Sequence, residues 1–269
     1  MIRREEEPAA FALHSVSLRR ERKRILADIS WTVKDAQRWV VLGPNGAGKT
    51  TLVRVLSTYL VASSGSVDVL GERVGRTDVA ELRRRIGYLS PSLAHMIPET
   101  LTPRQVVDAA QAGAVVPWYL DRNAIDAART NAALAAAGMA DAPARPFGTF
   151  SSGEQLRIQL ARALVTEPDA LLLDEPMASL DIGGRETLVT TLARVAAGPT
   201  GAIVIVLHRL EDIPPGFTHA LLLRAGRVTS AGPIGEVLAD EPISACFGTT
   251  LAVHRRGDRW AAHAPHRSE

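Results

Sequence analysis

The stretch that decides the fold is Trp39-Val-Val-Leu-Gly-Pro-Asn-Gly-Ala-Gly-Lys-Thr50. Its first four residues form a short apolar run, which is typical of a strand buried on both faces of a parallel sheet. The segment Gly43–Thr50 matches the pattern G-x-x-x-x-G-K-[ST], and leucines at helical spacing follow from Thr51. A strand, a glycine-rich loop and a helix in this order predict a phosphate-binding loop. The alternative is a tight glycine turn that binds nothing.

The chemistry of a bound triphosphate explains the spacing of this loop. Glycines let successive backbone N–H groups point at the phosphates, and the start of the helix adds positive potential. We expect Lys49 to bind the β- and γ-phosphates of ATP and the Thr50 hydroxyl to bind Mg²⁺. The loop residues expected to bind the nucleotide are Gly43, Asn45, Gly46, Gly48, Lys49, Thr50 and Thr51.

Two further apolar runs, Ala170–Leu173 and Ala202–Leu207, also predict buried parallel strands. A helix is expected between them, from Arg185 to Ala197, because Gly198 and a proline then end the helical pattern. A strand, a helix and a strand in succession predict a doubly wound α/β core.

Two carboxylates follow the first of these runs, at the strand end where open α/β sheets present ligands to a nucleotide. We expect Asp174 to be a direct or indirect ligand of Mg²⁺. Glu175 is expected to accept the proton of a water molecule that attacks the γ-phosphate. Without the glycine-rich loop, the pair would equally suit a solvated strand end.

The rest of the chain suggests elements around this core. Phe11–Val16 and Ile29–Val33 alternate apolar and polar residues, which predicts an antiparallel pair of strands. The region from Ser92 to Val165 is rich in alanine at helical spacing, and helices are expected at Asp121–Ala137 and Glu154–Leu164. The expected organisation is one domain, with a core (11–91 and 165–253), a helical subdomain (92–164), a hairpin at Ala220–Val228 and a loose tail (254–269).

Composition excludes several classes of protein. The chain has 269 residues, of which 46% are hydrophobic, so disorder of the whole chain is excluded. No apolar stretch approaches the roughly 20 residues of a membrane-spanning helix. The net charge is +2, so no nucleic acid partner is expected, and the basic runs at 19–24, 83–85 and 254–267 are interpreted as solvated faces or loops. A charged start without a signal sequence and a single cysteine, Cys246, predict a cytosolic protein.

From about Phe11 to Val253, the residues and their order resemble the ATP-binding cassette (ABC) ATPases. After the phosphate-binding loop, Phe150-Ser-Ser-Gly-Glu-Gln-Leu-Arg157 resembles the signature LSGGQ of the family with its usual arginine. Leu171-Leu-Leu-Asp-Glu-Pro176 resembles the Walker B strand with its catalytic glutamate, Ser179–Asp181 the D-loop, and His208 the switch histidine. A looser similarity points to single-cassette bacterial importers of the molybdate and iron type.

The resemblance implies a P-loop NTPase (RecA-like) core with an N-terminal antiparallel β subdomain and an inserted α-helical subdomain. It also implies a head-to-tail pair of cassettes that encloses two ATP molecules. Ser151 and Gly153 would contact the γ-phosphate held by the opposite subunit, Asp181 would cross the interface, and His208 would hydrogen-bond the γ-phosphate and act with Glu175. Two simpler interpretations stay open: Ser151-x-x-Glu154 is also an ordinary helix cap, and a lone histidine is usually a satisfied strand-end residue.

Three positions depart from the family pattern. Pro91 stands where the Q-loop glutamine is expected, so Mg²⁺ would need another ligand, such as Ser90, Ser92 or water. Arginine at position 19 or 20 replaces the aromatic residue that stacks on adenine, and Arg20 is the expected substitute. In the signature, Ser152 and Glu154 replace glycine and glutamine, which should weaken closure of the dimer unless Glu154 turns into a capping role.

Three functions are compatible with these residues. The first is the ATPase subunit of a transporter, which lies at the inner face of the membrane and drives a separately encoded permease through the helical insertion and the loop from Ser90 to Leu101. The second is an ABC ATPase of a macromolecular assembly process, such as Fe–S cluster building. The third is a slow, nucleotide-gated regulatory module. A kinase or GTPase is excluded, because the signature helix is present and no guanine-specificity motif occurs.

Overall fold

The computed structural model describes residues 9–111 and 125–265. At its centre lies a six-stranded sheet with the strand order β10-β9-β3-β8-β7-β6. Neighbouring strands from β9 to β6 run parallel, and β10 returns antiparallel to β9. These strands are β3 (Arg38–Leu42), β6 (Ile86–Leu89), β7 (Ala170–Asp174), β8 (Ala202–Val206), β9 (His219–Arg224) and β10 (Arg227–Pro233).

The apolar runs are continuous because both faces of this sheet are covered. In β7, Leu171 and Leu173 contact one hydrophobic core, and Ala170 and Leu172 contact the other. Side chains along a strand alternate between its two faces, so a strand between two cores has no polar face. The buried strands predicted from these runs are confirmed.

One of the two cores is closed by the helix α1 (Lys49–Leu56) and by a second, antiparallel sheet. The order of that sheet is β2-β1-β4-β5. The expected antiparallel pair is confirmed, with Leu13 opposite Trp31 and Val16 opposite Ile29. Its strands are β1 (Ala9–Arg20), β2 (Lys23–Lys34), β4 (Ser64–Val69) and β5 (Glu72–Arg73), and α2 (Val79–Arg84) leads from it to β6.

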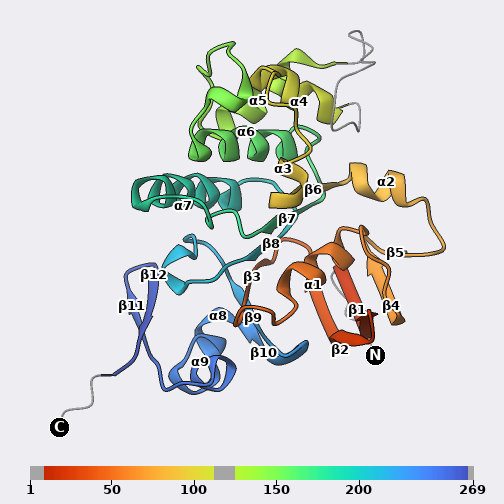
Figure 1. Ribbon diagram of the computed structural model, residues 1–269, viewed down its shortest axis with the longest axis vertical. Helices are drawn as coiled ribbons and strands as arrows, with labels where there is room; N and C mark the ends of the chain where they lie inside the picture. Colours follow the sequence, from red (N-terminus) through yellow and green to blue (C-terminus); the bar gives the residue numbers. More distant parts are fainter. Residues whose placement is uncertain (1–8, 112–124, 266–269) are drawn as a thin grey trace, which may run out of the picture.

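The other core is covered by helices. Figure 1 shows α4, α5 and α6 gathered at one end of the molecule, with α7 between them and the six-stranded sheet. The helix expected from Asp121 begins later: α5 begins at Ala127, because Asp126 is its N-cap, while residues 121–124 lie outside the described part. The helices are α3 (Pro91–Ala94), α4 (Pro103–Gln111), α5 (Ala127–Ala136), η2 (Phe147–Thr149), α6 (Ser152–Leu164) and α7 (Ile182–Ala197).

The end of the chain differs from the loose tail expected for residues 254–269. After η3 (Leu210–Asp212), α8 (Ile234–Val237) and α9 (Asp240–Phe247), the strands β11 (Ala252–Arg256) and β12 (Arg259–His263) form an antiparallel hairpin. Val253, Trp260 and Ala262 pack against the second core, which holds the hairpin in place. The expectation was wrong because the charged residues of this segment dominate its composition, although its apolar residues are enough to anchor it.

Within the described part of the chain, none of the helices has the length and apolar character that a bilayer-spanning helix requires.

Candidate functional site

The glycine-rich loop joins β3 to α1, and it approaches its neighbours too closely for side chains at two positions. Gly43 has φ +152°, and a Cβ atom there would lie 2.0 Å from the carbonyl oxygen of Leu223 in β9. Gly48 has φ +104°, and its Cβ would lie 3.0 Å from the carbonyl oxygen of Ile25 in β2. Only glycine adopts both the backbone angles and the close approach.

Lys49 is the first residue of α1, and its side chain folds back beneath the loop. Its Nζ donates hydrogen bonds to the carbonyl oxygens of Gly43 at 2.8 Å and Pro44 at 3.2 Å, and the residue is only 4% exposed. Burial lowers the pKa of Lys49, and the negative charges of Glu175 and Asp174 oppose this lowering. An ammonium group that has lost most of its water attracts a phosphate more strongly than a hydrated one.

Thr50 and Asp174 meet where α1 begins and β7 ends. The Thr50 Oγ1 donates a hydrogen bond to Oδ1 of Asp174 at 3.1 Å. Asp174 is 2% exposed, and burial raises its pKa to about 6. A hydroxyl and a carboxylate side by side are the hard oxygen donors that Mg²⁺ prefers, so this donor set fits the ion. A divalent cation here would also offset the buried negative charge.

Glu175 and His208 form the opposite side of the site. Glu175 has φ +51°, a left-handed conformation that is uncommon outside glycine and that concentrates at functional sites. Its backbone N–H donates to the carbonyl oxygen of Val206 at 3.2 Å. This turn brings its Oε1 to 2.7 Å from Nε2 of His208. Both side chains remain partly exposed, at 25% for Glu175 and 36% for His208, and are therefore accessible to a ligand.

Most of these residues line one cavity of about 460 Å³, which lies within the size range of small-molecule sites. Asp174 is not part of its surface, because it lies behind Thr50. The lining residues are Ile25, Asn45, Gly46, Ala47, Gly48, Lys49, Thr50, Thr51, Glu175 and His208.

Arg20, which we expect to stack on the base of the nucleotide, lies beside the turn of the β1–β2 hairpin. It is the exposed last residue of β1, opposite Lys23 across the hairpin, and it does not line the cavity. Ile25, on the returning strand β2, lines the cavity. A single aliphatic residue in an alternating strand carries no motif, so the sequence holds no signal for Ile25.

The signature segment lines a different cavity, of about 370 Å³, together with the residues around Asp181. Ser151 caps α6 in a capping box: its hydroxyl accepts from the Glu154 N–H at 3.3 Å, and Oε2 of Glu154 accepts from the Ser151 N–H at 2.8 Å. Asp181 caps α7 and accepts from the Gly184 N–H at 2.7 Å. The structure therefore gives Glu154 the capping role. Within one chain, Ser151, Gly153 and Asp181 do not line the cavity of Lys49.

Pro91 has a structural role at the start of a helix. It is the first residue of α3, where a missing N–H and a fixed φ are favourable. Ser90 is the N-cap of this helix, with its hydroxyl accepting from the Leu93 N–H at 3.2 Å, and it is 1% exposed. Among the described residues that line the cavity of Lys49, neither Ser90 nor Pro91 is present.

Replacing Ser151 with alanine is expected to lower the free energy of unfolding by about 1 kcal/mol, because α6 loses its N-cap. Urea denaturation at neutral pH measures this change.

Hydrogen bonds from the Ser151 backbone and hydroxyl lower the pKa of Glu154 from 4.5. The stabilising contribution of the Glu154 carboxylate is therefore present above pH 4.5 and is lost as the pH falls through the lowered pKa.

Glu154→Ala tests the direction of this pH dependence of stability. The stability difference between this variant and the wild type should be largest at pH 7 and should shrink as the pH is lowered below about 4.5. Glu154→Gln is the matched control, because glutamine also completes a capping box but carries no titratable group. A wild-type advantage over Glu154→Ala that stays constant across this pH range would contradict the capping role of the ionised carboxylate.

Comparisons with known proteins agree with the geometry. A family model described as "ABC transporter" matches residues 26–178. The chain is 38% identical to the uncharacterized ABC transporter ATP-binding protein YlmA of Bacillus subtilis, over 92% of this chain and 94% of the relative. It is 32% identical to the hemin import ATP-binding protein HmuV of Agrobacterium fabrum, over 90% of this chain and 92% of the relative.

Solved structures show the same fold. The cassette cbiO1 of Clostridium perfringens, described as part of the ABC transporter complex cbiONQ, superposes with a TM-score of 0.73 at 24% identity, over 88% of this chain and 93% of the other. The bacterial cassette MJ0796, solved as a dimer, has a TM-score of 0.71 at 21% identity, over 83% of this chain and 98% of the other.

Proposed function

The chain belongs to the ABC transporter family of ATP-binding cassettes, and from this premise we propose that it is the ATP-hydrolysing subunit that drives a separately encoded membrane permease. The observation that carries the proposal is the single cavity in which Lys49, Thr50, Glu175 and His208 meet. The relative named for hemin import favours an importer. The protein then acts at the cytoplasmic face of the membrane, where it binds the permease.

Each side chain of the cavity has a part in this proposal. Lys49 binds the β- and γ-phosphates of ATP, and the amides of Asn45 to Thr51 surround them. Thr50 and Asp174 hold Mg²⁺, which neutralises phosphate charge when bound. Glu175 accepts the proton of the attacking water, and His208 hydrogen-bonds the γ-phosphate from the opposite side. The contact of 2.7 Å between Glu175 and His208 supports their joint action.

The signature residues and Lys49 line two different cavities of one chain, so both can contact the same nucleotide only if a second copy is present. Ser151 and Gly153 lie on a different cavity from Lys49, so contact with the same nucleotide calls for a head-to-tail homodimer. In that dimer the N-terminus of α6 faces the γ-phosphate held by the other subunit, and Asp181 lies at the interface. Positive potential at the start of α6 suits this contact.

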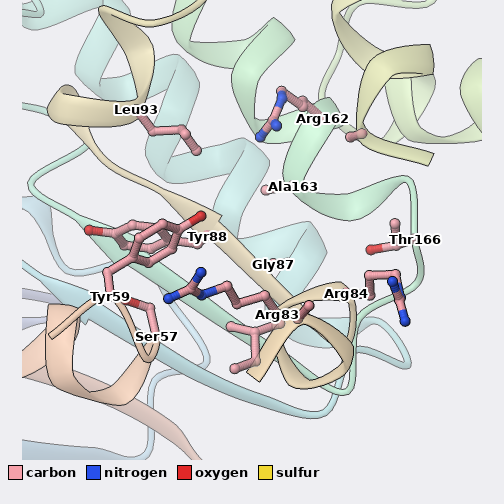
Figure 2. A pocket seen from close by; sticks show the side chains of 13 residues that line it. Ser57, Tyr59, Arg83, Arg84, Gly87, Tyr88, Leu93, Arg162, Ala163 and Thr166 are labelled. Carbon is pink, nitrogen blue, oxygen red and sulfur yellow. The ribbon is translucent and has the colours of Figure 1, made fainter. Parts of the chain in front are cut away.

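We place the permease at the junction of the helical subdomain and the core. Figure 2 shows the pocket of this junction, where Arg83 of α2 lies 4.4 Å from the centroid of the Tyr59 ring, and the rings of Tyr59 and Tyr88 lie 5.4 Å apart. Its volume is about 310 Å³, and its lining comes from the turn after α1 and from α2, β6, α3, α4 and the C-terminal end of α6. Met96, just after α3, is 61% exposed, and it belongs to the loop from Ser90 to Leu101.

Replacing Met96 with aspartate is expected to release the protein from the membrane fraction and to leave its own ATP binding unchanged. An exposed apolar side chain at an interface is replaced by a charge that must lose its water on docking. The measurement is the share of the protein that copurifies with membranes. Val61→Asp is the matched control, because Val61 is 79% exposed beside the antiparallel sheet. Equal retention of both variants would contradict this docking face.

The proposed function is tested by Mg²⁺-dependent phosphate release from ATP and by copurification of the wild type with a membrane permease. Steady turnover with a membrane partner is expected. Turnover with only soluble partners would favour an assembly ATPase, and ATP binding without turnover would favour a regulatory module.

A further inference from the structure

The C-terminal hairpin makes a specific contact close to the candidate site. Arg259, the first residue of β12, binds the carboxylate of Glu186 with both ends of its guanidinium: Nη1 to Oε2 at 2.7 Å and Nη2 to Oε1 at 3.0 Å. The same Nη2 also donates to the carbonyl oxygen of Glu211 at 2.6 Å. A single side chain therefore joins two segments that are distant in the sequence.

Both of these segments lead back to residues of the site. Glu186 lies on α7, the helix that Asp181 caps. Glu211 lies in η3, the turn that follows His208. A second contact, between Arg185 Nη1 and Asp212 Oδ2 at 3.3 Å, joins the same two elements. Arg259 thus holds the turn after His208 against the helix that follows the D-loop.

The turn is only partly packed, because Leu210 is buried in the core whereas His208 and Arg209 are exposed. His208–Glu211 line an open cavity of about 270 Å³ together with Ile243 and Phe247 of α9, Leu251 and Ala262. Unfilled space beside a segment leaves it fewer packing contacts, so it opens locally at a lower free energy. The hydrogen bonds of Arg259 add positional restraint to the packing of Leu210.

The charges of Arg259 and Glu186 favour the contact between them. Glu186 has a lowered pKa because of its hydrogen bonds with Arg259, so its carboxylate stays ionised at neutral pH. The other charged groups that face Arg259 are Asp212 and Glu211, and both favour its charged form. A planar guanidinium can bind a carboxylate bidentately and a carbonyl at once, whereas the compact ammonium group of lysine cannot reproduce this fork.

We propose that Arg259 is a positioning residue for His208, which it keeps within hydrogen-bond distance of Glu175 through the turn at Glu211. The proposal rests on the proposed ATPase function. Arg259 contacts neither His208 nor the nucleotide cavity. Its effect therefore passes through the backbone of the turn.

The test compares Arg259→Ala with Arg255→Ala. Arg255 lies in the same hairpin, and within the described residues 9–111 and 125–265 its guanidinium contacts only the hairpin itself, at Gly257, Asp258 and Trp260. We expect Arg259→Ala to lower kcat about 10- to 100-fold, because small displacements of catalytic groups have effects of this size. The equilibrium Kd for ATP should stay within about twofold, because Lys49 and the glycine-rich loop are untouched. Arg255→Ala should change neither quantity.

A double variant separates positioning from general structural damage. If Arg259 acts through His208, Arg259→Ala should have no further effect on kcat in the His208→Ala background. A further loss of similar size there would overturn the proposal, and so would equal kcat values for Arg259→Ala and Arg255→Ala. Arg259→Lys and Glu186→Gln are milder variants that serve if the alanine variant does not fold, and each should lower kcat with Kd unchanged.

A measurement without ATP keeps the proposal separate from the proposed function. The imidazole Cε1–Hε1 signal of His208, assigned by its absence from His208→Ala, should shift in Arg259→Ala and not in Arg255→Ala in nucleotide-free protein. An unchanged signal in Arg259→Ala would overturn the proposal. If the wild type itself releases no phosphate from ATP, the ATPase function fails, and the shift of this signal still decides whether Arg259 positions His208.

Discussion

Lys49→Ala is expected to lower the affinity for ATP by at least about 100-fold, equivalent to about 3 kcal/mol. The ammonium group is buried and lies within the curled loop, so its charge acts on the phosphates with little screening by water. The variant also loses the hydrogen bonds from Nζ to the carbonyl oxygens of Gly43 and Pro44, which hold the loop in shape. Isothermal titration calorimetry with ATP and Mg²⁺ measures the change.

Arg76→Ala is a matched control for the loss of one positive charge. Arg76 is exposed in the loop after β5 and does not line the cavity, so its removal should leave the affinity unchanged. Unfolding curves for both variants show whether the fold is intact. If folded Lys49→Ala bound ATP as tightly as Arg76→Ala, the assignment of Lys49 to the phosphates would be wrong.

The sequence predicts the centre of this site because its residues form contiguous patterns in the chain. The apolar runs of β3, β7 and β8 reflect burial on both faces, and the glycines at 43 and 48 reflect close backbone contacts. Each feature is visible in the sequence as a continuous run or a fixed spacing, although the contacts that explain the two glycines are made with β9 and β2. The doubly wound core and the neighbourhood of Lys49, Thr50 and Glu175 therefore follow from the sequence.

Other parts of the fold depend on distant contacts and are not visible in the sequence. Gly87 interrupts the apolar pattern of β6, and its reason lies in α6: a Cβ atom there would lie 2.4 Å from the carbonyl oxygen of Ala163. The hairpin β11–β12 is rich in charge, and it is held by the packing of Val253, Trp260 and Ala262 on the core and by the contact of Arg259 with Glu186 of α7. Neither contact has a local signature, so β6 and the hairpin could not be predicted.

The signature residues show a third limit on what the sequence can predict. Ser151 with Glu154 has the pattern of a capping box, and the structure contains that box. A role of Ser151 at the nucleotide of a second copy leaves no trace in one chain, because a cap and a phosphate contact use the same residue types. The sequence and the structure of a single chain therefore agree on the same local geometry. Only a property of the dimer can distinguish a helix cap from a phosphate contact.

Glu175→Gln is expected to bind ATP with the affinity of the wild type and to hydrolyse it roughly 100- to 10,000-fold more slowly, the usual contribution of a general base. The amide of glutamine keeps the shape of the side chain and can still hydrogen-bond Nε2 of His208, which lies 2.7 Å from the carboxylate. It cannot accept the proton of the attacking water. With binding intact and cleavage blocked, the ATP-bound dimer should accumulate, and light scattering would show a doubled mass.

Glu236→Gln is the control for loss of a carboxylate, because Glu236 is exposed on α8, away from the cavity. It should hydrolyse ATP at the wild-type rate and stay monomeric once its ATP is consumed. If Glu175→Gln and the wild type released phosphate equally fast, Glu175 would not be the base. If Glu175→Gln bound ATP and stopped hydrolysis but remained a monomer, the chemistry assigned to Glu175 would stand. The proposed closure of two identical copies over the nucleotide would then be wrong, because trapped ATP would have had no effect on association.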